Sequence, residues 1–486
     1  MESIKQQTVR SAKWNFVERI VSQGIQFLLG LLMARLLLPS DYGAVGMLAI
    51  FFAISQTFID SGFSSALIRK KEPTEQDFCT VFFFNFAISI VVYVILYFIA
   101  PWVAFFFKLE ILCPVLRVQS VTLIVNAIMA VQVAMLNIRL DFKSLALRNI
   151  IATLISGICG VVLAYFGYGI WALVFQQIIA AVVNLIFICA VCKWFPKVKF
   201  NKQSFKELGA FGSRLLASGL LHTLYSNMTT FAIGKFYSPK ELGFYTRGIH
   251  FAHVPNNAIN GVLQTVTYPI LARIQDDKSR LLYVYRKYIR LTSLCIFIFS
   301  GLLCALAKPI ILFCLTDKWS EAIIFLHVFA FSSMFDHLNT INLNLLKVNG
   351  RSDLYLRLEV IKKTIAIVIL FCAIPFGVLC ICLTQLLYNQ IAIFINSYYT
   401  GKLFNLGYLQ QMKDILPYLR CCIIACLPAF GITFLELPNI ITIIVGAAIA
   451  LFCYWLMLRK KPDMIELEEL IKDKLKKKNE KNISII

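Results

Sequence analysis

Charged residues are scarce in this sequence. They make up 15% of its 486 residues, and 59% of the residues are apolar, whereas soluble proteins carry about 25% charged residues. Proline and glycine are also few, with 14 and 23 residues, and no long polar tract interrupts the apolar runs. This composition leaves no room for a disordered region or a large soluble domain before the C-terminal tail, and it indicates an integral membrane protein.

Motifs of several enzyme classes are absent. Gly234-Lys235 and Gly401-Lys402 are followed by Phe and Leu, so neither completes a G-x-x-x-x-G-K-[ST] loop, and neither H-E-x-x-H nor D-x-D occurs. These absences argue against an ATPase, a zincin or a metal-dependent sugar-nucleotide transferase, and we expect no cofactor and no metal. Almost all of the 15 cysteines lie inside apolar runs, where cysteine behaves as a small hydrophobic residue, so we expect free thiols.

Cutting the sequence at its charged, proline and glycine residues leaves about fourteen apolar segments. A helix needs roughly 20 mainly apolar residues to cross a bilayer. The sequence therefore predicts an all-α polytopic membrane protein with about 14 transmembrane helices, at residues 14–37, 42–67, 79–100, 115–137, 149–167, 170–192, 211–234, 248–272, 291–313, 321–345, 361–376, 379–400, 416–435 and 440–458.

Lys and Arg are distributed unevenly between the gaps that separate these spans. With a cytoplasmic N-terminus, thirty-seven of the 47 lie toward the cytoplasmic side, in gaps, near span ends or in the tail. Six lie toward the other side, at Lys108, Lys235, Lys240, Arg247, Lys308 and Lys318. Positive charge is retained in the cytoplasm, so we expect both termini there. Topology thus accounts for the net charge of +21, and no nucleic-acid partner is needed. The first segment is too long and too charged for a cleaved signal peptide, so we expect it to be retained.

A short motif occurs twice, 200 residues apart. A basic residue, a proline, an acid and a glycine keep the same spacing in both copies: Arg35, Pro39, Asp41 and Gly43, then Lys235, Pro239, Glu241 and Gly243. Six spans separate the copies, so the two halves run parallel, and such proteins place a central cavity between their halves. The alternative is a common turn sequence.

The repeat predicts four parts of the chain. Residues 1–205 and 206–402 form two parallel six-helix lobes around a central cavity, and residues 403–458 add two transmembrane helices. Residues 459–486 form a basic amphipathic cytoplasmic tail that we expect to lie on anionic lipid headgroups, with partner binding as the alternative.

Polar side chains recur at helical spacing inside several spans. They are costly in lipid and are expected to face a cavity. Gln56 and Asp60 are four residues apart, and Asn256 and Asn260 repeat that spacing. The predicted cavity-lining set is Asn15, Gln23, Gln26, Gln56, Asn256, Asn260, Gln264, His222 and Tyr225.

Three arginines inside predicted spans are candidates for binding an anionic headgroup. Arg19 and Arg214 lie in the predicted cytoplasmic halves of their spans, and Arg117 lies toward the other side. A guanidinium stays charged and binds phosphate in a bidentate manner. The sequence therefore favours an anionic ligand over a cationic drug.

The alternative is that these charges hold helices together. Arg19 would pair with Glu18 or Asp60. Arg214 would pair with Asp336. The same three acids are candidates for coupling to a proton or sodium ion, although carboxylates tied to arginine would stay ionised.

Four stretches together resemble bacterial oligosaccharide flippases of the polysaccharide transporter family. They read SAKWNFVERIVSQGIQFLLGLLMARLLLPSDYGAVGM at 11–47, NIRLDFKSLALRN at 137–149, LTDKWSEAIIFL at 315–326 and LLKVNGRSDLYLR at 345–357. The likeness is to lipopolysaccharide and colanic-acid exporters of the multidrug/oligosaccharidyl-lipid/polysaccharide exporter superfamily, and it covers nearly the whole chain.

The resemblance implies alternating-access transport of undecaprenyl-diphosphate-linked oligosaccharide across the bacterial inner membrane. The implied partners are this lipid-linked substrate, membrane lipid and, as a candidate, a polysaccharide polymerase. Two other functions stay open: a cation or drug antiporter of the same superfamily, and a membrane enzyme of glycan assembly, for which the short outer loops provide no catalytic domain.

Overall fold

All regular secondary structure in the described part of the chain is helical. The computed structural model describes residues 4–60, 62–435 and 437–469; of these, the side chains at 4–13, 15–17, 19–20, 210–211, 214, 258–269 and 352 lie outside the description. Each of the fourteen predicted spans coincides with one helix or two consecutive helices, which confirms the all-α polytopic prediction. Ten of these segments are long and apolar enough, over the residues described, to cross a membrane.

The chain divides into two compact units, unit 1 at Met1–Gly243 and unit 2 at Phe244–Ile486. This boundary falls later than the predicted lobe boundary at 205/206 because the helix at Lys202–Phe236 packs along the helix at Pro39–Asp60. The predicted lobes are defined by the sequence repeat and not by packing, and they stay a prediction.

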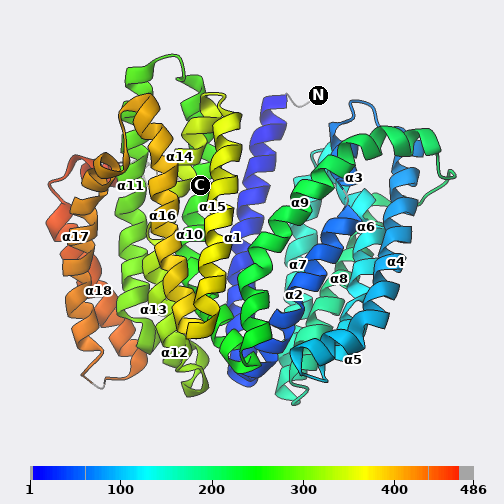
Figure 1. Ribbon diagram of the computed structural model, residues 1–486, viewed down its shortest axis with the longest axis horizontal. Helices are drawn as coiled ribbons and strands as arrows, with labels where there is room; N and C mark the ends of the chain where they lie inside the picture. Colours follow the sequence, from blue (N-terminus) through cyan, green and yellow to red (C-terminus); the bar gives the residue numbers. More distant parts are fainter. Residues whose placement is uncertain (1–3, 61, 436, 470–486) are drawn as a thin grey trace, which may run out of the picture. The chain divides into compact units, whose positions relative to one another are not determined.

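Unit 1 contains nine helices in its described residues and the first turn of a tenth (Figure 1). They are α1 (Ile4–Leu36), α2 (Pro39–Asp60), α3 (Phe63–Arg69), α4 (Glu75–Phe107), α5 (Leu112–Gln119), α6 (Val121–Ile138), α7 (Phe142–Tyr165), α8 (Ile170–Cys192), α9 (Lys202–Phe236) and the start of α10 (Pro239–Arg273). Helix α7 packs between α1 and α8, and α9 packs against α2, α3 and α4.

Local capping sets where the helices of unit 1 begin. At α4, the Thr74 side chain accepts a hydrogen bond from the Asp77 amide, and the Asp77 carboxylate accepts one from the Thr74 amide, which forms a capping box. The Nζ of Lys70 lies 3.0 Å from Asp77 and 3.1 Å from Glu207 of α9. Burial lowers the pKa of Lys70, but the hydrogen bonds to Asp77 and Glu207 outweigh burial and raise it above its usual value. These contacts tie the α3–α4 loop to the start of α9.

The two copies of the repeated motif contact each other within unit 1. A Cβ added to Gly43 would lie 1.7 Å from the carbonyl oxygen of Pro239, and one added to Gly243 would lie 1.9 Å from that of Pro39. The first turns of α2 and α10 therefore pack backbone to backbone in a reciprocal contact. The motif is a structural element and not only a common turn, and glycine is required at both positions.

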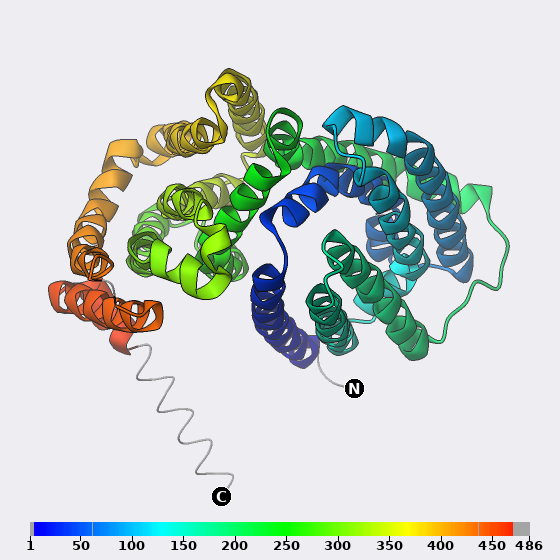
Figure 2. The ribbon, with the colours of Figure 1, turned by 90° about the horizontal axis from the view of Figure 1, so that it is seen from below.

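Unit 2 is built from the rest of α10 and the helices that follow it (Figure 1). They are α11 (Lys278–Ala305), α12 (Ala307–Leu315), η1 (Asp317–Trp319), α13 (Ala322–Ser333), α14 (Asp336–Val348), α15 (Ser352–Ala373), η2 (Ile374–Phe376), α16 (Val378–Phe404), α17 (Tyr408–Ile432) and α18 (Asn439–Leu458). Tyr285, Phe297 and Leu338 are fully buried in its main apolar core. Helices α17 and α18 lie side by side at the edge of this unit in both views (Figures 1 and 2).

The start of the predicted tail docks onto unit 2. Residues 462–469 are helical, and the carboxylate of Asp463 accepts hydrogen bonds from Arg290 and from the hydroxyl of Tyr418. Trp455 donates to Glu468 at 2.7 Å. This part of the tail is therefore held by side chains of α11, α17 and α18, and residues 470–486 lie outside the described residues.

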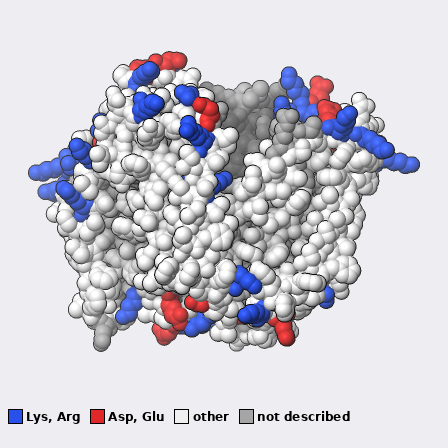
Figure 3. All heavy atoms as spheres, in the orientation of Figure 1, with Lys and Arg blue, Asp and Glu red and all other residues white. Residues whose placement is uncertain are grey.

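Charged side chains gather near the ends of the helices. On the face shown in Figure 3, each unit has Lys, Arg, Asp and Glu toward its two rims and a broad uncharged band between them. Such a band is what a membrane-spanning helical protein presents to lipid. The fifteen cysteines are all free thiols.

Candidate functional site

A cavity of about 570 Å³ with both polar and apolar walls lies within unit 1, among α2, α3, α6, α7 and α9. Its polar lining residues are Gln56, Thr57, Asp60, Ser64, Ser65, Asn126, Asn137 and Arg148. Polar side chains at membrane depth normally face a wet cavity or the inside of a bundle. The predicted polar face of α2 therefore lines a cavity formed by unit 1 itself.

A break in the second span shapes this cavity. The sequence predicts one helix over 42–67, but α2 ends at Asp60 and α3 begins at Phe63. Gly62 has a φ of 71°, and a Cβ there would lie 2.7 Å from the carbonyl oxygen of Gly212 in α9. Only glycine combines a left-handed backbone with so close an approach. Asp60, before the break, and Ser64, after it, both line the cavity.

Three side chains on the cavity wall form a hydrogen-bonded series. Asn126 of α6 donates to Gln56 Oε1 at 3.2 Å, and Gln56 Nε2 donates to Asp60 Oδ1 at 3.1 Å. Both polar groups of Gln56 are thus engaged, so its orientation is fixed. Asp60 is exposed to the cavity and is an acceptor when ionised.

Arg148 is a cavity residue that the sequence analysis missed. The predicted spans place Arg148 in the cytoplasmic gap between 137 and 149. In the structure α7 begins at Phe142, so Arg148 lies in its second turn. The signal that could have found it is Asp141, whose carboxylate accepts hydrogen bonds from the amide and hydroxyl of Ser144 at 3.1 and 2.7 Å. This N-cap starts the helix before the predicted span at 149.

The guanidinium of Arg148 is held by its neighbour. Its Nε and Nη2 donate to Asn149 Oδ1 at 3.3 and 2.9 Å, and Asn149 in turn donates to Glu18 Oε1 at 3.1 Å. Glu18, a predicted coupling residue, therefore lies in this series on α1. The Nη1 atom of Arg148 is buried and has no partner among the described residues.

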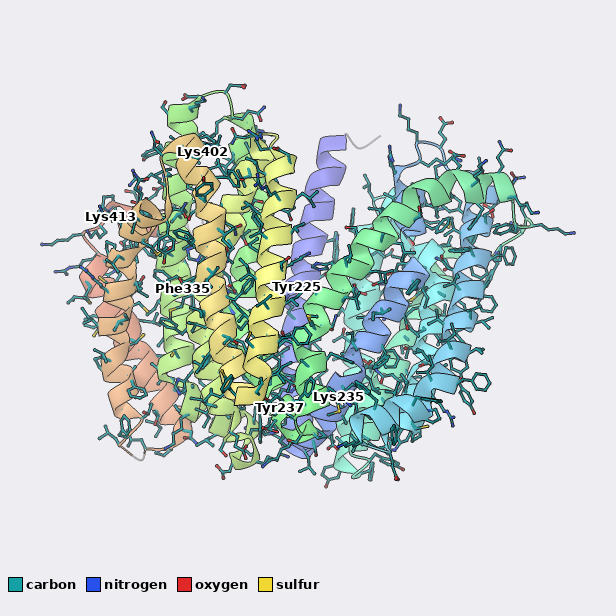
Figure 4. The ribbon with its side chains drawn as sticks, viewed as in Figure 1. Tyr225, Lys235, Tyr237, Phe335, Lys402 and Lys413 are labelled. Atoms are coloured by element: carbon teal, nitrogen blue, oxygen red, sulfur yellow. The ribbon has the colours of Figure 1, made fainter. Side chains whose placement is uncertain are left out.

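The predicted polar residues Asn256 and Asp336 of unit 2 bond to each other instead. The carboxylate of Asp336 accepts hydrogen bonds from Asn256 at 3.0 Å and from Asn389 at 2.7 Å. Asn256 also donates to the carbonyl of Ser333 and is 1% exposed. Phe335, labelled in Figure 4, marks the break between α13 and α14 beside this network. Sequence reasoning missed Asn389, although Gln385, Asn389 and Asn396 recur at helical spacing in α16.

The remaining described candidates lie on other surfaces. Arg117 donates through Nε to the carbonyl of Tyr97 at 3.2 Å and covers the ring of that tyrosine. Gln23 and Gln26 are exposed on α1.

Two further candidates lie on α9. His222 is exposed, and its carbonyl accepts a hydrogen bond from Ser226. Tyr225 is half-buried near the middle of the helix, and Lys235 marks its end (Figure 4). Thr223, which lies between His222 and Tyr225 in the sequence, bonds to Thr57 at 3.0 Å and connects α9 to α2.

Five predicted site residues have side chains outside the described residues. They are Asn15, Arg19, Arg214, Asn260 and Gln264. Among the described residues, no group of three or more His, Cys, Asp or Glu could hold a metal ion.

Comparison with known proteins identifies the family. A model of the polysaccharide biosynthesis protein family matches residues 32–324, which is more than half of the chain. The chain belongs to this family. The matched range includes α2, α6, α7 and α9, and therefore the whole cavity of unit 1.

Curated relatives of this family member cover about three quarters of its length or somewhat less. It is 25% identical to the teichuronic acid biosynthesis protein TuaB of Bacillus subtilis (strain 168) over 73% of this chain and 74% of that protein. It is 23% identical to the succinoglycan biosynthesis transport protein ExoT of Rhizobium meliloti (strain 1021) over 64% of this chain and 63% of that protein.

The fold is that of a solved membrane protein. The lipid II flippase MurJ in an inward closed conformation matches 93% of this chain and 99% of its own, with a TM-score of 0.71 and 14% identity. At that identity the match establishes a shared fold.

Proposed function

We propose that this protein is a flippase that moves polyprenyl-diphosphate-linked oligosaccharide across the bacterial inner membrane by alternating access. The observation that carries the proposal is the cavity of unit 1, which lies inside the segment that matches the polysaccharide biosynthesis family. A sugar headgroup needs hydrogen-bonding groups within an otherwise apolar protein, and this cavity provides them. The name of ExoT as a transport protein and the MurJ-like fold support the same function.

The proposed cycle assigns roles to the residues found in the sequence. Arg19 and Arg214 bind the diphosphate from the cytoplasmic side, and Arg117 assists its release. The polyprenyl chain stays in lipid. The groups proposed to bind sugar hydroxyls are Asn15, Gln23, Gln26, Gln56, Asn260 and Gln264. Asn256, another residue of the set expected from the sequence, is buried and donates to Asp336 and Ser333, so it is left out of this role.

Further parts of the proposal concern energy and partners. The protein is a transporter and not an enzyme, both termini are cytoplasmic, and a polysaccharide polymerase uses the exported unit. Glu18, Asp60 and Asp336 are the proposed sites of coupling to a proton or sodium ion. Among them, Asp60 faces the cavity, whereas Asp336 is bonded to two amides.

The experiment determines which leaflet holds the lipid-linked oligosaccharide in a deletion strain. A glycan probe that cannot pass the inner membrane reports units that face the periplasm. We expect complete units to face the cytoplasm and surface glycan to be lost. In the deletion strain, the wild-type protein should restore export fully and Arg214→Lys should restore it partly. Arg214→Ala at equal protein level should not restore it.

Two outcomes would contradict the flippase function, and a third would contradict the role assigned to Arg214. Unpolymerised or incomplete units that already face the periplasm would indicate an enzyme of glycan assembly. Unchanged surface glycan together with altered drug susceptibility would indicate the antiporter function. Full export by Arg214→Ala would remove the assigned role of Arg214 and leave the flippase function standing.

A further inference from the structure

A second concave surface of unit 1, which we call the α4 groove, lies where α4 ends. It has a volume of about 970 Å³ and is formed by α2, α4, α5, α9 and the loop between α4 and α5. None of its lining residues also lines the cavity described above. All of them are apolar except Lys108, Glu110 and Lys235. The α4 groove is therefore an apolar surface with three charged groups.

Two aromatic side chains of α4 indicate the depth of the groove in the membrane. Trp102 is 77% exposed and Phe105 is 85% exposed, and both line the groove. Aromatic side chains of this kind are enriched where lipid headgroups meet the hydrocarbon. Lys108 and Glu110, which follow the end of α4, are exposed as well. The groove therefore offers an apolar surface and charged groups at the level of the lipid headgroups.

Lys235 at the end of α9 is a positioned cation in this groove. Its Nζ donates to the carbonyl of Phe106 at 2.7 Å and lies 3.5 Å from the centroid of the Phe106 ring. Its place near the end of the helix is seen in Figure 4. An ammonium group has more donors than this one bond uses. An anionic oxygen in the groove can accept one of them in a charge-assisted hydrogen bond.

Lys108 and Glu110 provide one further charge of each sign. Neither side chain forms an ion pair with another residue in the part of the chain that the structure describes. A headgroup with negative charge alone would suit the lysines but would be repelled by Glu110. A headgroup that joins a phosphate to a primary ammonium suits both, because a carboxylate accepts hydrogen bonds and an ammonium donates them.

We propose that the α4 groove binds a phospholipid with an ethanolamine headgroup. An acyl chain lies against Trp102 and Phe105, the phosphate accepts hydrogen bonds from Lys108 and Lys235, and Glu110 accepts one from the ammonium. The other lipid that could enter, a polyprenyl diphosphate, has no cation for Glu110. This site concerns a lipid of the surrounding bilayer, so it goes beyond the proposed function and requires no transport.

The test is native mass spectrometry of the full chain released from detergent micelles, which resolves each bound lipid. The probes are dioleoyl phosphatidylethanolamine, dioleoyl phosphatidylcholine, dioleoyl phosphatidylglycerol and undecaprenyl diphosphate. We expect the ethanolamine lipid to bind at least fivefold more tightly than the choline lipid, whose nitrogen has no hydrogen to donate. It should exceed the glycerol lipid by a similar factor, because that headgroup has no cation for Glu110.

Variants separate the charged groups of the groove from general charge. Glu110→Gln should abolish the preference for the ethanolamine lipid over the glycerol lipid. Lys108→Gln should weaken the ethanolamine lipid at least threefold and leave undecaprenyl diphosphate unchanged. Lys308→Gln is the matched control, because Lys308 is exposed on α12 and does not line the groove. Lys108 and Glu110 are exposed, so these variants test the site without disturbing the bond from Lys235 to Phe106.

Three results would overturn the inference. The first is equal binding of the three phospholipids by the wild-type protein. The second is a preference for the ethanolamine lipid that persists in Glu110→Gln. The third is a Lys108→Gln variant that binds undecaprenyl diphosphate more weakly and the ethanolamine lipid normally, which would assign the groove to the polyprenyl lipid. None of these results bears on the leaflet measurement that tests the flippase function.

Discussion

Helices α2 and α10 carry the two copies of the repeat, and they are alike at their start and different further along. Each begins with proline and places a glycine against the backbone of the other copy. Gln56 of α2 lines a cavity, whereas its counterpart Asn256 in α10 is buried and donates to Asp336. Backbone geometry is thus kept between the copies, and the use of equivalent polar side chains is not.

This difference shows what a polar residue inside a span can mean. Both Gln56 and Asn256 satisfy the rule that membrane-buried polar groups avoid lipid. Gln56 does so beside a cavity, and Asn256 does so by donating from Nδ2 to Asp336 and Ser333. Asn256 is buried against Asp336 and stabilises the fold, whereas Gln56, although bonded to Asn126 and Asp60, also borders the cavity.

The largest expected effect tests the likeness of the two copies. Gly43→Ala and Gly243→Ala should each destabilise the protein by about 3 kcal/mol, the upper end of the usual cost of overpacking, because the added Cβ meets a backbone carbonyl. Thermal unfolding in nanodiscs measures both. Gly24→Ala is the control, since nothing lies within 4 Å of that position, and it should be neutral or slightly stabilising. If only one of the two variants were destabilised, the contact between the copies would not be symmetric.

The second prediction tests the difference between the copies. Asn256→Ala should lower the free energy of unfolding by about 2 kcal/mol, because Asp336 and the Ser333 carbonyl lose a buried donor. Gln56→Ala should change it by less than about 0.5 kcal/mol, since water in the cavity can replace the amide. The same melts measure both variants. Equal losses of stability in the two variants would mean that Gln56 contributes as much to the fold as Asn256 does.

The sequence was sufficient to predict most of the fold. The length of the apolar runs, and the charged, proline and glycine residues between them, located all fourteen spans. The repeat located the paired starts of α2 and α10. The break at Gly62 was not predicted, because it depends on a close approach to α9 that only tertiary packing creates. Pro101 ended the predicted third span, but α4 continues through it to Phe107.

The candidate site was predicted less completely. Gln56 and Asp60 were found because their spacing places them on one face of a helix. Arg148 was missed because a charge near a span boundary was taken as topology, and only the N-cap at Asp141 shows that it lies inside α7. Asn389 was overlooked even though Gln385 and Asn396 lie at helical spacing from it in α16.

The smallest expected effect concerns the caps of the two copies. In the second copy, Ser238 Oγ accepts from the Glu241 amide at 3.2 Å while Glu241 accepts from the Ser238 amide at 3.0 Å. In the first copy, Asp41 accepts from the Leu38 amide at 2.9 Å, but Leu38 has no side-chain oxygen to return the bond. The first box is therefore half complete.

Completing that box should stabilise the protein slightly. Leu38→Ser should be more stable than Leu38→Ala by about 1 kcal/mol, and Ser238→Ala should lose about the same amount relative to wild type, because an N-cap hydroxyl contributes roughly this much. The comparison with Leu38→Ala removes the effect of losing the leucine side chain, which is 56% exposed. Thermal unfolding of the three variants gives both differences. The two copies share the same backbone arrangement, so the stability gained at residue 38 should equal the stability lost at residue 238. A difference larger than the error of the unfolding measurements would show that the reciprocal contact constrains the two caps differently.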